Sequence, residues 1–239
     1  MSAAECIHGF EPGLCDTCYP KAQPERPKVV RPKRLATPRR TAPVIAARPT
    51  MTAAEQRAFH VTHLGNLEGI LASGELLADA RPPIDVSSDL TRELRATAEV
   101  APGEPVSGYV PFYLDPQATL WLELRDGSAD PRWSAAGRAA SSAEFVFLIT
   151  TVAALGPDVV IADGDAASTY TRFAAGEDVD PMLERLHDTD VRPDAEALAK
   201  GRVPWAAVQL IGVANEKIRD RVRQLTSTKV AVYPPWFTA

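Results

Sequence analysis

The sequence predicts an α+β domain built on a mixed or antiparallel sheet with flanking helices. Short runs of β-branched and aromatic residues, bounded by Pro, Gly and Asp, recur through the second half of the chain. The helical stretches between these runs do not alternate with them regularly, which argues against a parallel α/β sheet. A chain of 239 residues, 45% of them apolar, is long enough for one such domain and an appendage.

The first predicted elements lie between residues 52 and 74. Thr52 and Glu55 have the spacing of a capping box, so we expect the folded domain to begin near Thr52. A short strand over 59–64 follows, and then a helix over 66–73 that Gly74 stops.

A second helix is predicted over 88–100, where Leu90 and Leu94 lie one turn apart and Arg92 and Arg95 fall on neighbouring faces. After it the hydrophobic period changes. The remaining predicted strands are 109–114, 118–124, 144–152, 159–162, 208–213 and 228–233, and helices are expected over 180–187 and 215–225.

A zinc site is predicted in the first 20 residues. Three thiolates and one imidazole can close a tetrahedron around Zn²⁺, and the ligands would be Cys6, His8, Cys15 and Cys18. Because this set leaves no open position, we expect a structural site that orders a small module over 1–20. The alternative is that Cys15 and Cys18 are a redox pair without metal.

Residues 21–51 are rich in Pro, Lys, Arg and Ala without hydrophobic periodicity, and they predict a basic linker. The first 50 residues carry nine Lys and Arg against four Asp and Glu, so the rest of the chain carries 17 against 27. A basic arm of this kind contacts nucleic acid or is a solvated linker. The chain shows no secretory leader and no long apolar span, so we expect a cytoplasmic protein.

The segment from Phe59 carries a candidate ligand-binding strand. On a strand, His60 and Thr62 point to one face, whereas Val61 and His63 point to the other. The helix after Asn66 would bring unpaired N–H groups to the same strand end, which suits a diphosphate. Taken alone, a histidine such as His60 is more often an ordinary surface or core residue than a ligand.

Three segments, taken in order, resemble the DarT family of bacterial toxins that ADP-ribosylate single-stranded DNA. They are HVTHLGNLEGILASGEL, RATAEVAPGEPVSGYVPFYL and AEALAKGRVPWAAVQLIGV, and the resemblance extends from about Phe59 to Trp236. It implies an ADP-ribosyltransferase fold over 52–239 and a glycosyltransferase that uses NAD as a substrate. It also implies single-stranded DNA as a partner and a cognate antitoxin.

The resemblance assigns roles to individual residues. Glu196 and Arg95 match the catalytic glutamate and arginine of the family. NAD would be held by His60, Val61, Thr62, Asn66 and Arg95. Arg92 is the rival for the arginine role, because the spacing from the arginine to Val110 is shorter than the family pattern leads us to expect.

The chemistry suits these residue types. Cleavage of NAD leaves an oxocarbenium-like ribose that a carboxylate such as Glu196 stabilises, and the carboxylate can also accept a hydrogen bond from a ribose hydroxyl. Arg95 would bind the diphosphate or draw charge from the acceptor nitrogen. It is no general base, because a guanidinium stays protonated. The alternative interpretation makes Glu196 a surface residue on a short helix and Arg95 a solvated cation.

Departures from the family pattern leave other functions open. Arg192, Pro193 and Asp194 stand before Glu196 where a basic residue and Gln are expected, so the modified base stays open and an inactive relative is an alternative. A tRNA 2′-phosphotransferase-like enzyme shares the fold but needs more basic residues than this acidic body offers. A non-catalytic nucleic-acid adaptor is the third possibility.

Overall fold

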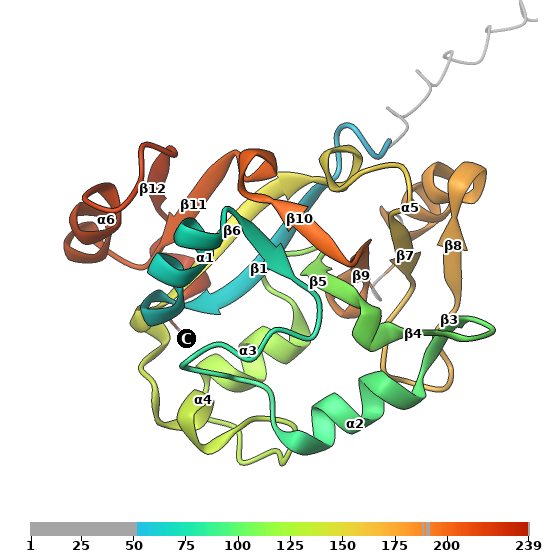
Figure 1. The fold of residues 1–239 in the computed structure, drawn as a ribbon, viewed down its shortest axis with the longest axis horizontal. Helices are drawn as coiled ribbons and strands as arrows, with labels where there is room; N and C mark the ends of the chain where they lie inside the picture. Colours follow the sequence, from blue (N-terminus) through green and yellow to red (C-terminus); the bar gives the residue numbers. More distant parts are fainter. Residues whose placement is uncertain (1–51, 188, 190–191, 239) are drawn as a thin grey trace, which may run out of the picture. The chain divides into compact units, whose positions relative to one another are not determined.

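The computed structural model describes residues 52–187, 189 and 192–238, all within one unit of the fold, Ala47–Ala239. An eight-stranded sheet in the order β12-β11-β6-β1-β5-β9-β7-β8 runs through it (Figure 1). Its strands are β1 (Arg57–His63), β5 (Tyr109–Tyr113), β6 (Phe145–Thr151), β7 (Val160–Ala162), β8 (Phe173–Ala175), β9 (Glu196–Lys200), β11 (Leu210–Val213) and β12 (Val230–Val232). Only the β11–β12 pair is parallel among these described strands, so the prediction of a mixed or antiparallel sheet is confirmed, and the sheet is mixed and mostly antiparallel.

Two short strand pairs and six α-helices, together with eight short 3-10 helices, complete the described part of the chain. The pairs are β2 (Glu75–Leu77) with β10 (Arg202–Pro204), and β3 (Glu99–Ala101) with β4 (Glu104–Pro105). The helices are α1 (Leu67–Ser73), α2 (Asp89–Thr97), α3 (Thr119–Arg125), α4 (Ala135–Ala139), α5 (Val179–His187) and α6 (Glu216–Arg223). Of these helices, none is long and apolar enough to cross a membrane.

Alternation along the strands divides the core between the two faces of the sheet. One face carries Ala58 and Leu148, against which helices α1, α5 and α6 pack. The opposite face carries Phe59 and Phe147, which pack against α3 and the C-terminal segment. Apolar residues on both faces explain why the central strand β6 reads as a nearly continuous apolar run.

The predicted strand over 118–124 is wrong, because these residues form α3. Asp115 and Pro116 end β5, and the run that follows buries Trp121 and Leu124 at helical spacing. Leu, Glu and Arg favour a helix, and a short apolar run does not distinguish a strand from a buried helix by period alone. Trp121 Nε1 donates to the Trp236 carbonyl at 2.7 Å, which ties α3 to the C-terminal segment.

Two further expectations are corrected near the site. The helix predicted over 88–100 ends at Thr97, because Val100 lies in β3. Glu196 does not lie on a short surface helix; it opens the buried strand β9, whose helix-favouring sequence EALAK is overridden by sheet pairing on both sides. The predicted zinc ligands and the linker lie in residues 1–51, outside the described residues.

Candidate active site

A row of paired residues crosses four strands of the sheet and contains Glu196. Phe59 of β1 is opposite Tyr113 of β5, Tyr113 is opposite Glu196 of β9, and Glu196 is opposite Ala162 of β7. Directly paired residues share a face, so Tyr113 and Glu196 are neighbours on the face that α3 covers. The Glu196 side chain is only 1% exposed.

Both oxygens of the Glu196 carboxylate have partners. Oε1 accepts a hydrogen bond from the main-chain N–H of Ala166 at 3.0 Å, and Oε2 accepts one from Arg95 Nη1 at 3.2 Å. Arg95 comes from the last turn of α2, and its side chain is 16% exposed. Its second terminal nitrogen, Nη2, is buried and has no hydrogen-bond partner among the described residues. The two residues that the family resemblance pairs therefore meet, and one donor is left over.

Burial dominates the electrostatics of this carboxylate. Removal from water raises the pKa of Glu196 above its ordinary value, the Arg95 guanidinium opposes that rise, and the nearby Asp165 adds to it. The same burial, with the Glu196 charge beside it, raises the pKa of the Tyr113 phenol, which therefore stays protonated at neutral pH. The site thus combines an ion pair, a neutral phenol and an unused guanidinium donor.

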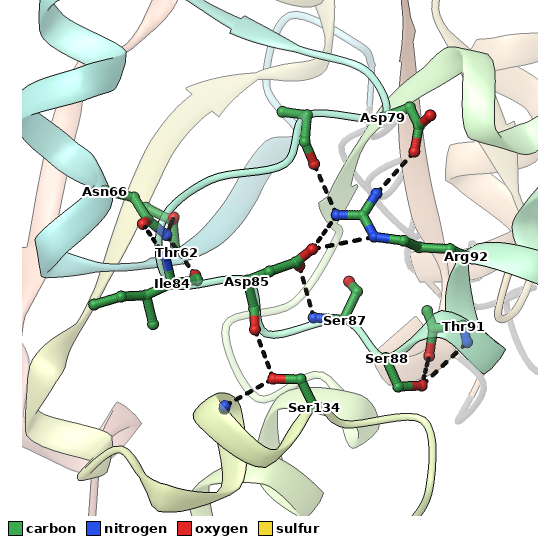
Figure 2. Close-up of polar contacts among 12 residues, drawn as sticks. Thr62, Asn66, Asp79, Ile84, Asp85, Ser87, Ser88, Thr91, Arg92 and Ser134 are labelled. Carbon is green, nitrogen blue, oxygen red and sulfur yellow. Dashed lines mark hydrogen bonds and ion pairs between the residues drawn. The ribbon is translucent and has the colours of Figure 1, made fainter.

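Arg92 holds the loop over residues 79–85. Figure 2 shows its guanidinium between Asp85 and Asp79, with Nη1 2.8 Å from Asp79 Oδ1 and Nε 3.1 Å from Asp85 Oδ2. Nη2 donates to the carbonyl of Ala80 at 2.8 Å. Since every guanidinium nitrogen of Arg92 bonds within residues 79–85, the geometry favours Arg95 over Arg92 as the arginine beside the carboxylate.

His60 lies where β1 and β5 separate. Of the described residues in these two strands, only Phe59 and Tyr113 are directly paired, and beyond them the Pro111 carbonyl contacts His60 Nδ1 at 2.9 Å. A carbonyl only accepts, so Nδ1 carries the proton and Nε2 is an acceptor in the neutral ring. Burial lowers the pKa of His60 despite that hydrogen bond, and the charge of Arg95 lowers it further. At neutral pH His60 therefore offers an acceptor.

The other residues predicted to bind NAD are arranged around the end of β1. Val61 is partly buried on the opposite side of the strand from His60 and Thr62. The Asn66 amide donates to Thr62 Oγ1 at 3.3 Å and to the Ile84 carbonyl at 2.8 Å, and it accepts from Ile84 N at 3.0 Å (Figure 2). Asn66 thus fastens the 79–88 loop to the strand.

Some residues at the site escaped sequence reasoning. Tyr113, Asp165, Arg132 and the Ala166 amide surround the Glu196–Arg95 pair, but no local motif marks them. A main-chain donor has no sequence signature. Arg132 and Asp165 lie on separate loops and meet only in the folded chain, with 3.5 Å between Nη1 and Oδ2.

A cavity of ≈ 600 Å³ opens beyond the end of β1, next to α6. Its wall includes the apolar side chains of Leu64, Ile84 and Ile218, the basic groups Lys217 and Arg221, and one acidic group, Glu144. No ion pair of these two cations is found within the part of the chain that the structure describes. Apolar walls beside two cations suit a base and a phosphate. Within the same residues no cluster of His, Cys, Asp and Glu is suited to a metal.

Comparison with known proteins gives one consistent result. The family model described as "ssDNA thymidine ADP-ribosyltransferase, DarT" matches residues 59–238. A DNA ADP-ribosyl transferase of Mycobacterium tuberculosis is 31% identical over 195 residues, which cover 70% of this chain and 80% of the relative.

Solved structures show the same fold. Thermus sp. 2.9 DarT in complex with ADP-ribosylated ssDNA has a TM-score of 0.65 at 21% identity and covers 76% of this chain and 96% of its own. The complex of that protein with NAD+ has a TM-score of 0.61 at 22% identity, covering 76% and 97%. Thermosipho africanus DarTG in complex with ADP-ribose has a TM-score of 0.57 at 15% identity, covering 76% and 51%.

Proposed function

The chain belongs to the DarT family of DNA ADP-ribosyltransferases, and from this premise we propose that it transfers ADP-ribose from NAD to thymine in single-stranded DNA. Glu196 is the catalytic carboxylate of this reaction. The family description supports thymine as the acceptor, a choice that the sequence alone left open. The observation that carries the site assignment is the buried Glu196–Arg95 pair with an unused donor, Arg95 Nη2.

In the proposed reaction one C–N bond replaces another. The glycosidic bond between the anomeric carbon and nicotinamide breaks, and nicotinamide leaves with the electron pair. In a DNA chain N3 is the ring nitrogen of thymine that bears a proton, and it bonds to the anomeric carbon as that proton departs.

Glu196 serves this exchange in two ways. Its carboxylate stabilises the oxocarbenium-like ribose, and it accepts the proton from N3, for which its raised pKa is suited. Arg95 cannot take that proton, because a guanidinium stays charged. Its Nη2 instead donates to an oxygen of the substrate, either the NAD diphosphate or a carbonyl of thymine.

NAD binding is assigned to the end of β1. His60 presents Nε2 as an acceptor for a ribose hydroxyl, and the main chain at Val61 borders the same strand separation. Thr62 and Asn66 hold the 79–88 loop against the strand and so shape the wall of the site. Arg95, whose charge acts on His60, is paired with Glu196.

Single-stranded DNA needs phosphate contacts that an acidic domain offers at few places. We assign one contact to Lys217 and Arg221 at the cavity beside α6, where Ile84 and Ile218 can cover a base. The basic segment 21–51 would supply others, since Lys and Arg release counterions from phosphates.

The N-terminal proposals complete this picture. We propose that residues 1–20 form a structural zinc module on Cys6, His8, Cys15 and Cys18, that 21–51 are a linker, and that 52–239 are the transferase domain. A cytoplasmic toxin acting on DNA, checked by a cognate antitoxin, is the role we infer for the whole chain. The similarity to a DarTG protein supports the antitoxin.

The direct test uses the purified chain and its Glu196→Gln variant, incubated with NAD and single-stranded oligonucleotides that contain or lack thymine. We expect a mass increment of one ADP-ribosyl group on thymine-containing DNA with the wild type alone. The control is Glu184→Gln, on the exposed side of α5, which should match the wild type. Modification of thymine-free DNA would refute the acceptor, and unchanged activity of Glu196→Gln would refute the site.

The same position tests the biological role. Expression of the wild type is expected to stop growth, and Glu196→Ala should relieve that effect. Equal toxicity of both proteins would show that catalysis is not the cause. Intact NAD together with DNA binding would favour the adaptor, and transfer to a phosphorylated RNA would favour the phosphotransferase.

A further inference from the structure

Arg132 contacts both structures that hold Glu196. Its carbonyl accepts hydrogen bonds from Ser88 N at 3.0 Å and from Thr91 Oγ1 at 2.5 Å, at the start of α2. That helix carries Arg95 in its last turn. The guanidinium of Arg132 extends the other way to Asp165, 3.5 Å away. One residue thus links the helix that bears Arg95 to the loop that bears Ala166.

Asp165 defines the turn that presents the Ala166 N–H. Its Oδ1 accepts a hydrogen bond from Ala167 N at 2.9 Å, and its carbonyl accepts one from Thr171 Oγ1 at 2.6 Å. Between these contacts, Ala166 N donates to Glu196 Oε1 at 3.0 Å. The direction of that N–H therefore depends on where the Asp165 side chain is held.

Two other carboxylates also hold the Arg132 side chain in place. Nη2 donates to Glu123 Oε2 at 2.8 Å, and Nε donates to Asp130 Oδ1 at 3.1 Å. Because two carboxylates already fix this planar guanidinium, its interaction with a third carboxylate, that of Asp165, costs little additional side-chain entropy. Arg132 and Asp165 are each 28% exposed, so water weakens their pair only in part.

We propose that Arg132 and Asp165 are positioning residues for ADP-ribosyl transfer. Together they hold the Ala166 N–H on one oxygen of Glu196, and they hold α2 so that Arg95 meets the other. Neither residue contacts the Glu196 carboxylate itself. The inference rests on the proposed function of Glu196 and adds to it two residues that no motif contains.

The pair also sets the charge around Glu196. Four groups face this carboxylate or its partners: Arg95 from α2, Tyr113 from β5, Asp165 from the 163–171 loop and, behind Asp165, Arg132. The negative charge of Asp165 raises the Glu196 pKa, and Arg132 offsets that charge. Removal of Asp165 should therefore move the acid limb of activity to lower pH even where the Ala166 hydrogen bond is lost, because the Asp165 charge affects the Glu196 pKa more than that hydrogen bond does. Removal of Arg132 should move the acid limb to higher pH.

The experiment compares full-length Arg132→Ala, Arg132→Lys, Asp165→Asn and the double variant Arg132→Ala/Asp165→Asn by steady-state oligonucleotide modification at several pH values. The matched control is Arg202→Ala, which removes a surface arginine paired with Glu75. We expect kcat of Arg132→Ala and Asp165→Asn to fall at least about tenfold, because small displacements of catalytic groups cost that much. KM for NAD should change by less than about threefold.

Two readouts separate positioning from a general loss of structure. The acid limbs of the two single variants should shift in opposite directions, with the double variant between them, and Arg132→Lys should recover part of kcat. The inference would be overturned if all variants kept the wild-type kcat, or if both single variants lost kcat and their acid limbs did not shift in opposite directions. The proposed function would still stand in that case, provided that Glu196→Gln is inactive. If Arg132→Ala does not fold, Asp165→Asn, which keeps the side-chain shape, decides. A fall in kcat together with an acid limb at lower pH supports the inference, and wild-type kcat or an unmoved acid limb overturns it. An inactive wild type would instead refute the proposed function.

Discussion

Glu196 shows how a charged side chain can be kept inside a sheet. A carboxylate with 1% exposure would lose most of its hydration. The structure compensates with one charged donor, Arg95, and one main-chain donor, Ala166. Both donors come from outside the strand, so removal of either should leave Glu196 in place but raise its pKa further. A buried ion pair of this kind recovers only part of the hydration free energy that its two charges lose.

His60 permits a test at the same scale. If Nε2 accepts a ribose hydroxyl, His60→Ala should raise KM for NAD about tenfold, the effect of one hydrogen bond of roughly 1.4 kcal/mol, with a smaller change in kcat. The check is NAD-dependent kinetics beside His187→Ala, a histidine on the exposed end of α5. An unchanged KM would remove His60 from the NAD site.

The protonation state of His60 can be measured independently. Burial lowers its pKa, so the neutral form is favoured in the folded protein and the imidazole should titrate below 6.5. NMR titration of the ring checks this direction. A midpoint above 6.5 would contradict this direction, and a midpoint above the assay pH would mean that a cation, not an acceptor, faces the substrate.

At the scale of elements, helices and loops determine which side chains meet. Helix α2 begins after its N-cap, Ser88, and Arg92 and Arg95 lie three residues apart along the helix. Arg92 is used to hold the 79–85 segment, and Arg95 is left to reach β9. Because three residues make almost one helical turn, the placement of α2 along its own axis decides which of the two arginines reaches β9.

Two basic residues of helix α6, Lys217 and Arg221, are expected to bind single-stranded DNA. Lys217→Ala/Arg221→Ala should weaken binding of single-stranded DNA and reduce the salt dependence, by about 0.7 in log–log slope for each phosphate that the variant no longer neutralises. Arg219→Ala is the control, because that arginine lies on the same helix but pairs with Asp220. NAD cleavage without DNA should remain unchanged. A raised KM for NAD would assign the cavity to the nucleotide of NAD instead of DNA.

At the scale of the whole molecule, charge is divided between the N-terminal segment and the rest. The first 50 residues have an excess of five basic groups, whereas the rest has an excess of ten acidic groups. An acidic enzyme that modifies a polyanion needs local groups of basic residues on its surface, although its net charge is negative. Lys217 and Arg221 form one such group in the described part, and the N-terminal segment is a second candidate.

Deletion of residues 1–51 tests that assignment. We expect the truncated chain to modify oligonucleotides with a higher KM for DNA and a shallower salt dependence, and with KM for NAD unchanged. Metal analysis of the full chain, purified without chelators, should find one zinc per molecule, and Cys15→Ser/Cys18→Ser should abolish it. Full activity of the truncated chain toward DNA would reduce the N-terminus to a role outside catalysis.

Local pattern was sufficient for much of the fold. Strands β1, β6 and β11 and helices α5 and α6 were predicted at nearly their observed positions, since apolar period and flanking caps are encoded within a few neighbouring residues. The predicted strand over 118–124 is the helix α3, and β9 was not predicted, because the local preference of both sequences is ambiguous or opposed to the fold. Only pairing with distant strands made EALAK a strand. The short elements β2, β3, β4, β8, β10 and α4 were not predicted either.

The sequence by itself determined which residues can take part in the chemistry, and the family resemblance singled out Glu196 and Arg95 among many charged residues. The tertiary structure decided which arginine faces the carboxylate and which loop supplies its second donor. Arg95 and Glu196 are 101 residues apart, and Arg132 and Asp165 lie on different loops. Such contacts depend on sheet register and helix placement, and these arise from the packing of the whole domain, which no local sequence pattern specifies.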